Sequence, residues 1–410
     1  MNSPKVQTDS PANVKKILYV SGSLGLGHIT RDLAIADELR KLNPAIEVSW
    51  VAAHPASRVI REAGEKLHPA AGDFANDNDP AEKAAKGTQL NLLKYLMKAS
   101  REWSRNFETI CRITSSEHFD LVIGDETYEI VVGFQKKPGL KTVPLVMIYD
   151  FIGLDAMSSS PLEKLGIYVW NRIWSKGFKS GKDPVFDLGL FIGEKEDVPD
   201  RTFGFRLPNR RDFAYSLLKF VGYILPFDAG DYSDKLRIRK KLGYGEEPLI
   251  VCAIGGTSVG RELLNLCAEA YPGLKDQMPG LRLVLVCGPR LSPDSIEVPQ
   301  GVEVKGYVPA LYEHFAACDL AIVQGGGTTT LELSALKRPF LYFPLEGHFE
   351  QTYVAERLAR HKAGIRMSYS QTTPQMLTEA VLSSLGKEAG TDTIPTDGAQ
   401  IAAQLISRLL

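Results

Sequence analysis

A histidine in a glycine-rich segment near the start of the chain has the character of a general base. Residues 21 to 28 read Ser-Gly-Ser-Leu-Gly-Leu-Gly-His, after a short apolar run and before a helical pattern. A histidine near its ordinary pKa removes a proton from a hydroxyl group at neutral pH. We therefore predict that His28 is a catalytic base, beside a loop that includes Gly25 and Gly27. The alternative is that His28 only hydrogen-bonds its own loop.

An aspartate that ends a later strand is the predicted partner of this histidine. Asp125 follows the apolar run Leu121 to Gly124. A carboxylate there would orient the imidazole and stabilise its charged form. Glu126 and Glu129 are competing partners, and a loop aspartate is often only a turn or cap residue.

A second glycine cluster, in the last third of the chain, has the character of a phosphate site. Gly325, Gly326 and Gly327 follow an apolar strand and precede a helix that we expect to begin near Thr328. Glycines let the backbone approach a phosphate, and the free N–H groups of a helix start supply positive potential. The cluster predicts a diphosphate site that needs no metal, the alternative being an ordinary tight turn. Gln324, just before it, adds a hydrogen-bond donor without charge.

Polar side chains that follow this cluster could bind the hydroxyl groups of a ligand held there. Glu332 lies in the predicted helix, where its carboxylate could accept both hydrogen bonds from a ribose diol. Glu350 and Gln351 open the next helix and could bond sugar hydroxyls. The alternative for each is a solvated or salt-bridged helix residue.

Alternating strands and helices must position these residues. We expect strands at Lys16–Val20, Glu47–Ala53, Leu121–Gly124 and Pro144–Tyr149, which predicts a parallel sheet with helices on both faces. The glycine spacing does not fit the dinucleotide pattern G-x-G-x-x-G, because Thr30 stands where the third glycine belongs. A dehydrogenase is therefore disfavoured.

The second half of the chain repeats this plan. A strand at Pro248–Ile254 enters another glycine loop, with Gly255, Gly256 and Thr257, and a helix follows. The glycines and proline of residues 222–231 indicate a linker. We predict an N-terminal domain over residues 1–225, a C-terminal domain over 226–397, and a final helix over 398–410 that packs back on the first domain.

Composition limits the class of protein. The 410 residues suit two domains, and 48 basic against 49 acidic side chains give no charge field for nucleic acid. An odd count of five cysteines without a C-x-x-C pair favours a reducing compartment. Residues 1–16 lack the apolar core of a signal peptide, and no apolar run is long enough to span a bilayer. We expect a cytoplasmic protein.

The ordered pattern of the second half resembles the nucleotide-sugar signature of GT-B glycosyltransferases in families 1 and 28, which include the peptidoglycan GlcNAc transferase and UDP-glycosyltransferases of small molecules. The matching positions are Val308-Pro309, Asp319, Gly325-Gly326, Glu332, Pro339, Pro344 and Glu350-Gln351. The first loop also resembles the Gly-x-Gly-His element of these families. One position departs from the pattern, because family 1 members often have histidine where this chain has Gln324.

This resemblance implies the GT-B fold, an α/β architecture in which two Rossmann-like, doubly wound domains face each other across a cleft. It implies an inverting, metal-independent hexosyltransferase that uses a UDP-sugar as substrate and needs no cofactor. Uracil would lie near the backbone of Tyr307 and Val308, the diphosphate on the glycines, the ribose on Glu332 and the sugar on Gln351. Rival functions on this fold are a nucleotide-sugar epimerase or hydrolase, and a non-catalytic subunit that binds the nucleotide sugar.

Two further segments bear on metals and membranes. Asp77-Asn-Asp79 matches a metal-binding D-x-D pattern but lies in a polar loop, so we interpret it as solvated and expect no metal. Leu162 to Lys182 mixes aromatic and basic residues, which suits peripheral contact with the inner face of an anionic membrane and a lipid-linked acceptor. The alternatives are aromatic packing on the domain core and a small-molecule acceptor.

Overall fold

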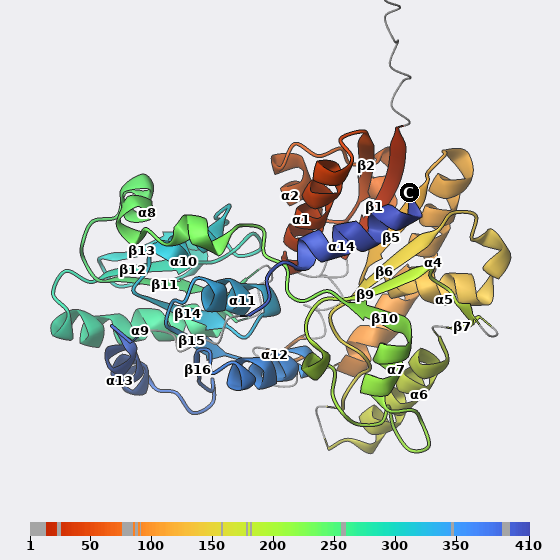
Figure 1. Cartoon of the computed structure of the whole chain (residues 1–410). Coiled ribbons are helices and arrows are strands. Elements are labelled where there is room, and N and C mark those ends of the chain that lie inside the picture. The colour runs from red at the N-terminus through yellow and green to blue at the C-terminus, as the bar shows by residue number, and fades with distance from the viewer. Residues whose placement is uncertain are drawn as a thin grey trace, which may run out of the picture.

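The computed structural model contains two parallel sheets that stand side by side, each flanked by helices (Figure 1). It describes residues 14–22, 26–75, 85–86, 89–90, 92–156, 159–177, 179–180, 183–255, 260–345, 348–387 and 394–410. The chain closes the first sheet before it begins the second.

The first sheet is six-stranded, with the order β10-β9-β6-β5-β1-β2 and every neighbouring pair parallel. Its strands are β1 (Lys15–Ser21), β2 (Ile46–Val51), β5 (Leu121–Asp125), β6 (Leu145–Tyr149), β9 (Leu188–Phe191) and β10 (Leu218–Phe220). Its helices are α1 (Gly27–Leu42), α2 (Ala56–Glu62), α4 (Leu92–Ser116), α5 (Tyr128–Lys136), α6 (Pro161–Gly177) and α7 (Arg210–Leu217). Two short hairpins, β3 (Ala85–Lys86) with β4 (Gln89–Leu90) and β7 (Lys179–Ser180) with β8 (Asp183–Pro184), lie outside the sheet.

The second sheet is also six-stranded and parallel, with the order β13-β12-β11-β14-β15-β16. Its strands are β11 (Leu249–Ala253), β12 (Arg282–Val286), β13 (Val302–Lys305), β14 (Leu320–Gln324), β15 (Phe340–Phe343) and β16 (Ile365–Arg366). Its helices are α8 (Lys235–Leu242), α9 (Arg261–Gln277), α10 (Leu311–Ala317), α11 (Gly327–Ala335), α12 (Phe349–Arg360) and α13 (Pro374–Ser384). The predicted doubly wound α/β class is confirmed.

Both sheets are buried on both faces, which explains why their central strands are continuous apolar runs. In β1, Leu18 and Val20 belong to the core on one face, whereas Ile17 and Tyr19 belong to the core on the other. Strand β11 divides its side chains between two cores in the same way. This packing fixes the strand ends, and with them the loops that carry the candidate site residues.

The last helix, α14 (Gly398–Ile406), lies against α1 of the first sheet rather than against the second sheet, which precedes it in the chain (Figure 1). Its buried face includes Ala402, Ala403 and Ile406, which join the same apolar cluster as Ile35 and Leu39 of α1. The chain therefore crosses between the two sheets twice, and after the second crossing α14 packs against α1.

Candidate functional site

A cavity of about 710 Å³ separates the two sheets at the carboxyl ends of their strands. Its walls include His28 and Arg31 of α1, Asp150 after β6, Gln324 at the end of β14, and Glu332 of α11. Ligands of doubly wound folds bind at this edge of the sheet. The predicted catalytic base and the predicted nucleotide-binding residues thus line one cavity from opposite sides.

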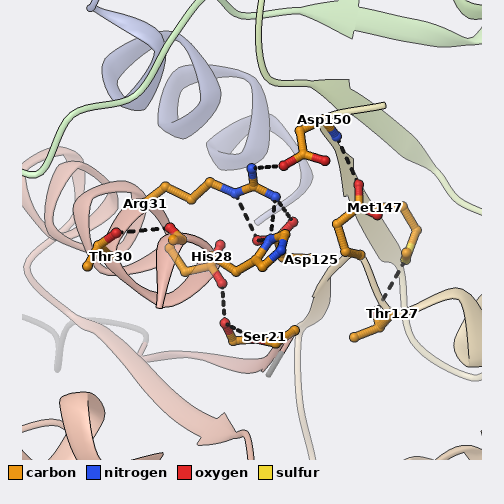
Figure 2. A network of polar contacts seen from close by, with 12 residues as sticks. Ser21, His28, Thr30, Arg31, Asp125, Thr127, Met147 and Asp150 are labelled. Carbon is orange, nitrogen blue, oxygen red and sulfur yellow. Dashed lines mark hydrogen bonds and ion pairs between the residues drawn. The ribbon is translucent and has the colours of Figure 1, made fainter. Parts of the chain in front are cut away.

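His28 lies in the first turn of α1, which begins at Gly27. Its Nδ1 is 3.1 Å from Oδ2 of Asp125, the last residue of β5 (Figure 2). A terminal nitrogen of Arg31, which can only donate, also lies 2.7 Å from Nδ1. In the tautomer in which Nδ1 carries the proton and donates to Asp125, Nε2 is the nitrogen that can accept a proton. The structure thus brings together the two residues that the sequence suggested as base and orienting carboxylate.

Arg31, which the sequence analysis did not single out, joins this pair from the next turn of α1. Its Nε and one terminal nitrogen donate to the two oxygens of Asp125 at 2.9 and 2.5 Å, a bidentate arrangement. Its other terminal nitrogen donates to Asp150 at 2.6 Å (Figure 2). Arg31 therefore links the partner of His28 to a second carboxylate.

The burial and the charges around His28 act on its pKa in opposite directions. Burial and the nearby Arg31 charge act against protonation, but Asp125 and Asp150 outweigh them and raise the pKa of His28. Burial likewise opposes ionisation of Asp125, yet Arg31 and His28 hold its pKa well below the usual range. The two negative charges of Asp125 and Asp150 exceed the one positive charge of Arg31, so a protonated His28 would neutralise the remaining charge.

The two glutamates that competed with Asp125 have other partners. Glu126 accepts hydrogen bonds from the Asp150 backbone N–H, at 2.9 Å, and from the Tyr128 hydroxyl. Glu129 is buried on α5 and accepts a hydrogen bond from Nδ2 of Asn106 at 3.3 Å. Asp125 is thus the carboxylate in contact with His28.

Across the cavity, the glycine cluster forms the start of α11, one residue earlier than expected. Gly326 caps the helix and Gly327 is its first residue, so the first N–H groups of the helix have no partner within it. Gly325 is tightly confined, because a Cβ there would lie 3.1 Å from Cα of Pro344. Gly326, Gly327 and Thr328 line the cavity, as an anion site requires.

The two sides of the cavity touch at Gly27 and Thr328. A Cβ at position 27 would collide with Oγ1 of Thr328, so α1 and α11 approach each other closely at this glycine. The contact places the helix that carries the candidate base next to the helix that carries the candidate diphosphate site.

Glu332 lies on α11 with 7% of its surface exposed and lines the cavity. Among the residues that the structure describes, it has no hydrogen-bond or ion-pair partner. Burial raises the pKa of this carboxyl to about 8. A buried carboxylate without a partner is costly, which fits a group that receives its hydrogen bonds from a ligand.

Glu350 and Gln351 lie in the first turn of α12 and line the cavity. Oε1 of Gln351 accepts a hydrogen bond from the Leu345 N–H at 2.7 Å, so its amide nitrogen is the group available to a sugar. Burial, with a smaller effect of Asp150, raises the pKa of Glu350 to about 7. Burial also lowers the pKa of His348, the residue that caps α12, to about 4.

Some of the remaining predicted donor residues line the cavity, and others lie outside the described residues. Tyr307 and Val308 line the cavity, and the Tyr307 ring lies 4.6 Å from the guanidinium carbon of Arg58 on α2. Gly255 and Gln324 also line it. Gly25, Gly256 and Thr257 lie outside the described residues, as do Asp77 and Asp79 of the D-x-D pattern.

Sequence reasoning missed several cavity residues, among them the charged side chains of Arg31, Asp150 and Arg357. Arg31 follows His28 by three positions, a spacing that places both on one face of a helix, so it could have been found. Asp150 follows a strand adjacent to that of Asp125, but this order is known only once the sheet is formed. Arg357 lies deep in α12 and carries no sequence signal of its own.

The described residues also bear on a metal site and on a membrane span. In the described part of the chain, no group of three or more His, Cys, Asp or Glu side chains is arranged to hold a metal ion. No described helix is both long enough and apolar enough to cross a membrane.

Comparison with known sequences gives the chain its relatives. Residues 250–404 match the model of the glycosyltransferase family 28 C-terminal domain. An uncharacterized glycosyltransferase of Methanosarcina acetivorans is 32% identical over 380 residues, covering 92% of this chain and 89% of the relative. The UDP-N-acetylglucosamine N-acetylmuramyl-(pentapeptide) pyrophosphoryl-undecaprenol N-acetylglucosamine transferase of Saccharopolyspora erythraea is 25% identical over 381 residues, covering 91% and 87%.

Comparison with solved structures supports the same architecture. The glycotransferase of kitacinnamycin has a TM-score of 0.61 at 16% identity and covers 97% of this chain and 99% of its own. A Streptomyces sp. SF2575 glycosyltransferase complexed with thymidine diphosphate has a TM-score of 0.57 at 17% identity, with coverages of 96% and 99%. These likenesses confirm the predicted GT-B fold.

Proposed function

Because the chain belongs to the glycosyltransferases with a family 28 C-terminal domain, we propose that it moves a sugar from a UDP-sugar to an acceptor hydroxyl, with inversion and without a metal ion. One observation carries the proposal. His28, which contacts Asp125, and the buried Glu332 line the same cavity from opposite sides, so a base and a nucleotide site face each other.

On the acceptor side, His28 acts as the base. Its Nδ1–H donates to Asp125, and its Nε2 takes the proton of the acceptor hydroxyl as the oxygen forms a bond to the anomeric carbon. The resulting imidazolium is stabilised by Asp125 and Asp150. The sugar–phosphate bond breaks on the opposite face of the anomeric carbon, which inverts the configuration.

On the donor side, the start of α11 receives the departing diphosphate. The N–H groups that follow Gly326 and the helix dipole stabilise its charge. Glu332 accepts hydrogen bonds from the ribose diol, Glu350 and Gln351 bind the sugar, and uracil lies beside Tyr307 and Val308. A UDP donor agrees with the name of the Saccharopolyspora relative, and the Streptomyces neighbour was solved with a related nucleoside diphosphate.

The test is transfer from a panel of UDP-sugars, with dTDP-sugars as comparison, in the presence and absence of an acceptor extract. We expect a glycosylated product only with an acceptor, and an anomeric configuration opposite to that of the donor by NMR. Interconversion or hydrolysis of the donor at the same rate without acceptor would instead identify an epimerase or a hydrolase.

We further propose that α6 rests on an anionic membrane and that the acceptor is lipid-linked. Part of the reason for this expectation proved wrong, because Trp170 and Trp174 pack on the protein core. Another face of the helix is exposed and apolar. Its members recur at helical spacing and have exposures of 74% for Leu162, 61% for Leu165, 48% for Val169 and 43% for Ile173.

Charge around this face suits anionic head groups. Lys164, Arg172 and Lys176 are exposed on the same helix, and interfacial helices combine an apolar face with such cations. The inner side of α6 contributes Ile167 to a small cluster with Tyr353 of α12, so the proposed membrane face lies close to the proposed sugar site. The name of the Saccharopolyspora relative specifies a pyrophosphoryl-undecaprenol acceptor.

Vesicle sedimentation tests the membrane proposal. The protein should bind vesicles rich in anionic lipid, and Leu162→Gln with Leu165→Gln should reduce that binding. Leu236→Gln is the matched control, because Leu236 is 66% exposed on α8 of the other domain. Equal binding by all three proteins would contradict the role of α6.

A further inference from the structure

The donor cavity contains a cation that none of the proposed steps uses. Arg357 lies in α12 and lines the cavity, together with the start of α11. One terminal nitrogen of its guanidinium donates to the carbonyl oxygen of Gly327, the first residue of α11, at 3.1 Å. Arg357 is thus attached to the same helix start that supplies the proposed diphosphate site.

The guanidinium is also held from a second direction. Its central carbon lies 5.2 Å from the centroid of the Tyr223 ring, which belongs to the connection between the two sheets. A guanidinium held over a ring keeps its remaining N–H donors in a fixed plane. The bond to Gly327 uses one of five donors, and within the described part of the chain the others have no hydrogen-bond partner, which leaves them for a ligand.

Two other basic side chains of the cavity, Arg31 and His348, do not offer a free positive charge. Arg31 contacts two carboxylates, those of Asp125 and Asp150, and both lie within 2.6 Å of its nitrogens. Burial keeps His348 neutral by lowering its pKa to about 4. Arg357, in contrast, forms no ion pair with any carboxylate among the described residues.

The residue immediately before the glycine cluster cannot supply the missing charge. Gln324 is neutral, and its amide nitrogen occupies the space where a Cβ of Gly260 would lie. It is therefore packed against the loop before α9. A diphosphate brings two or more negative charges into a cavity that already holds the carboxyl groups of Glu332 and Glu350. Backbone N–H groups carry only partial charge, so a cation beside them would strengthen binding considerably.

We propose that Arg357 binds the diphosphate of the donor and provides the full positive charge of that site. The assignment rests on the proposed function, since it presumes a nucleoside diphosphate donor. It makes Arg357 a determinant of specificity for diphosphate over monophosphate or nucleoside.

Calorimetric binding of UDP, UMP and uridine to the full chain tests this role. Arg357→Gln should weaken UDP binding by about tenfold to a hundredfold, the range for hydrogen bonds to a charged group, and leave uridine binding unchanged. Arg357→Lys should lose less, because lysine keeps the charge but not the planar fork.

The matched control is Arg360→Gln, which removes the same charge from the same helix. Arg360 instead pairs with Glu194 and Asp197 of the first domain, at 3.0 and 2.9 Å. This variant should keep the wild-type ratio of UDP to uridine affinity. An equal change of that ratio in both variants would show a general effect of α12 and overturn the assignment.

Different results would contradict the role of Arg357 and the assignment of a UDP-sugar donor. Tight binding of UDP by the wild type, with the same preference for UDP over uridine in Arg357→Gln, overturns the role of Arg357 and leaves the donor assignment intact. A wild-type protein that binds no uridine nucleotide overturns both.

Discussion

The imidazole Nδ1 of His28 lies 3.1 Å from Oδ2 of Asp125, a carboxylate with no exposed surface. The two residues are 97 positions apart in the chain. Their pairing orients the ring, and the tautomer with the proton on Nδ1 leaves Nε2 to act as the base. The surrounding charges, which include Arg31 and Asp150, adjust how readily that nitrogen holds a proton.

His28→Ala should lower kcat by about a hundredfold or more, because general-base catalysis typically contributes 10²- to 10⁴-fold. Affinity for UDP should stay nearly the same, since the proposed nucleotide contacts come from the other domain. Steady-state kinetics and calorimetry measure the two effects separately. Wild-type turnover in a variant that still binds UDP would remove His28 from the mechanism.

Asp150→Asn should shift the acidic limb of the pH profile of kcat/KM to lower pH. The base must be neutral to act, so activity rises with pH through the pKa of His28. Burial and Arg31 lower that pKa, whereas Asp125 and Asp150 raise it above its ordinary value. Replacing Asp150 removes one of the raising charges while the contact with Asp125 remains.

Two controls identify the group that titrates. Asp200→Asn removes the same charge from a site outside the cavity, where Asp200 pairs with Arg211, and should leave the limb in place. Glu350, whose pKa burial raises to about 7, titrates in a similar range. A limb that disappears in Glu350→Gln would assign the titration to Glu350 and contradict the assignment to His28.

Activity should survive chelation, because helix N–H groups replace a cation at the diphosphate in our proposal. Transfer measured in excess EDTA should equal the untreated rate. A loss on chelation that Mn²⁺ or Mg²⁺ restores would show that the donor site requires a metal ion.

The sequence was sufficient to predict the fold class and several of the polar residues that line the cavity, for a physical reason. Continuous apolar runs followed by glycines mark buried parallel strands, and the ligand edge of such a sheet is the carboxyl end. His28, Glu332 and Gln351 could therefore be placed at the cavity before any contact was known.

Residues whose role depends on tertiary neighbours could not be found in that way. Asp150 contacts Arg31, and Arg357 contacts Gly327. The residues of each pair are far apart in the chain, so no sequence motif predicts either contact. On α6, periodicity alone did not separate the buried Trp170 side from the exposed Leu165 side. Element ends also moved, since α11 begins at Gly327 rather than near Thr328, and a glycine is a weak helix signal.

Glu332→Gln should raise the melting temperature of the empty protein. Burial raises the pKa of Glu332 from its ordinary 4.5 to about 8, so the folded state favours the protonated carboxyl. The stability associated with that protonated form is present below pH 4.5 and is lost as the pH rises to about 8. The gap between variant and wild type should therefore widen from pH 5 to pH 8 in a thermal scan. A constant gap would show that the carboxyl is not buried in its charged form.

Glu332→Ala should weaken binding of UDP more than binding of 2′-deoxy-UDP. In our proposal the carboxylate accepts hydrogen bonds from both ribose hydroxyls, and a bond to a charged group contributes roughly 1.5 to 3 kcal/mol. The deoxy analogue has already lost one of these bonds in the wild type, so it has less to lose when the side chain is removed. The double comparison, two proteins with two nucleotides, isolates the interaction between the carboxylate and the 2′-hydroxyl. Equal losses for both nucleotides would show that Glu332 supports α11 without contacting the 2′-hydroxyl, and the site would then suit a deoxyribose donor as well as a ribose one.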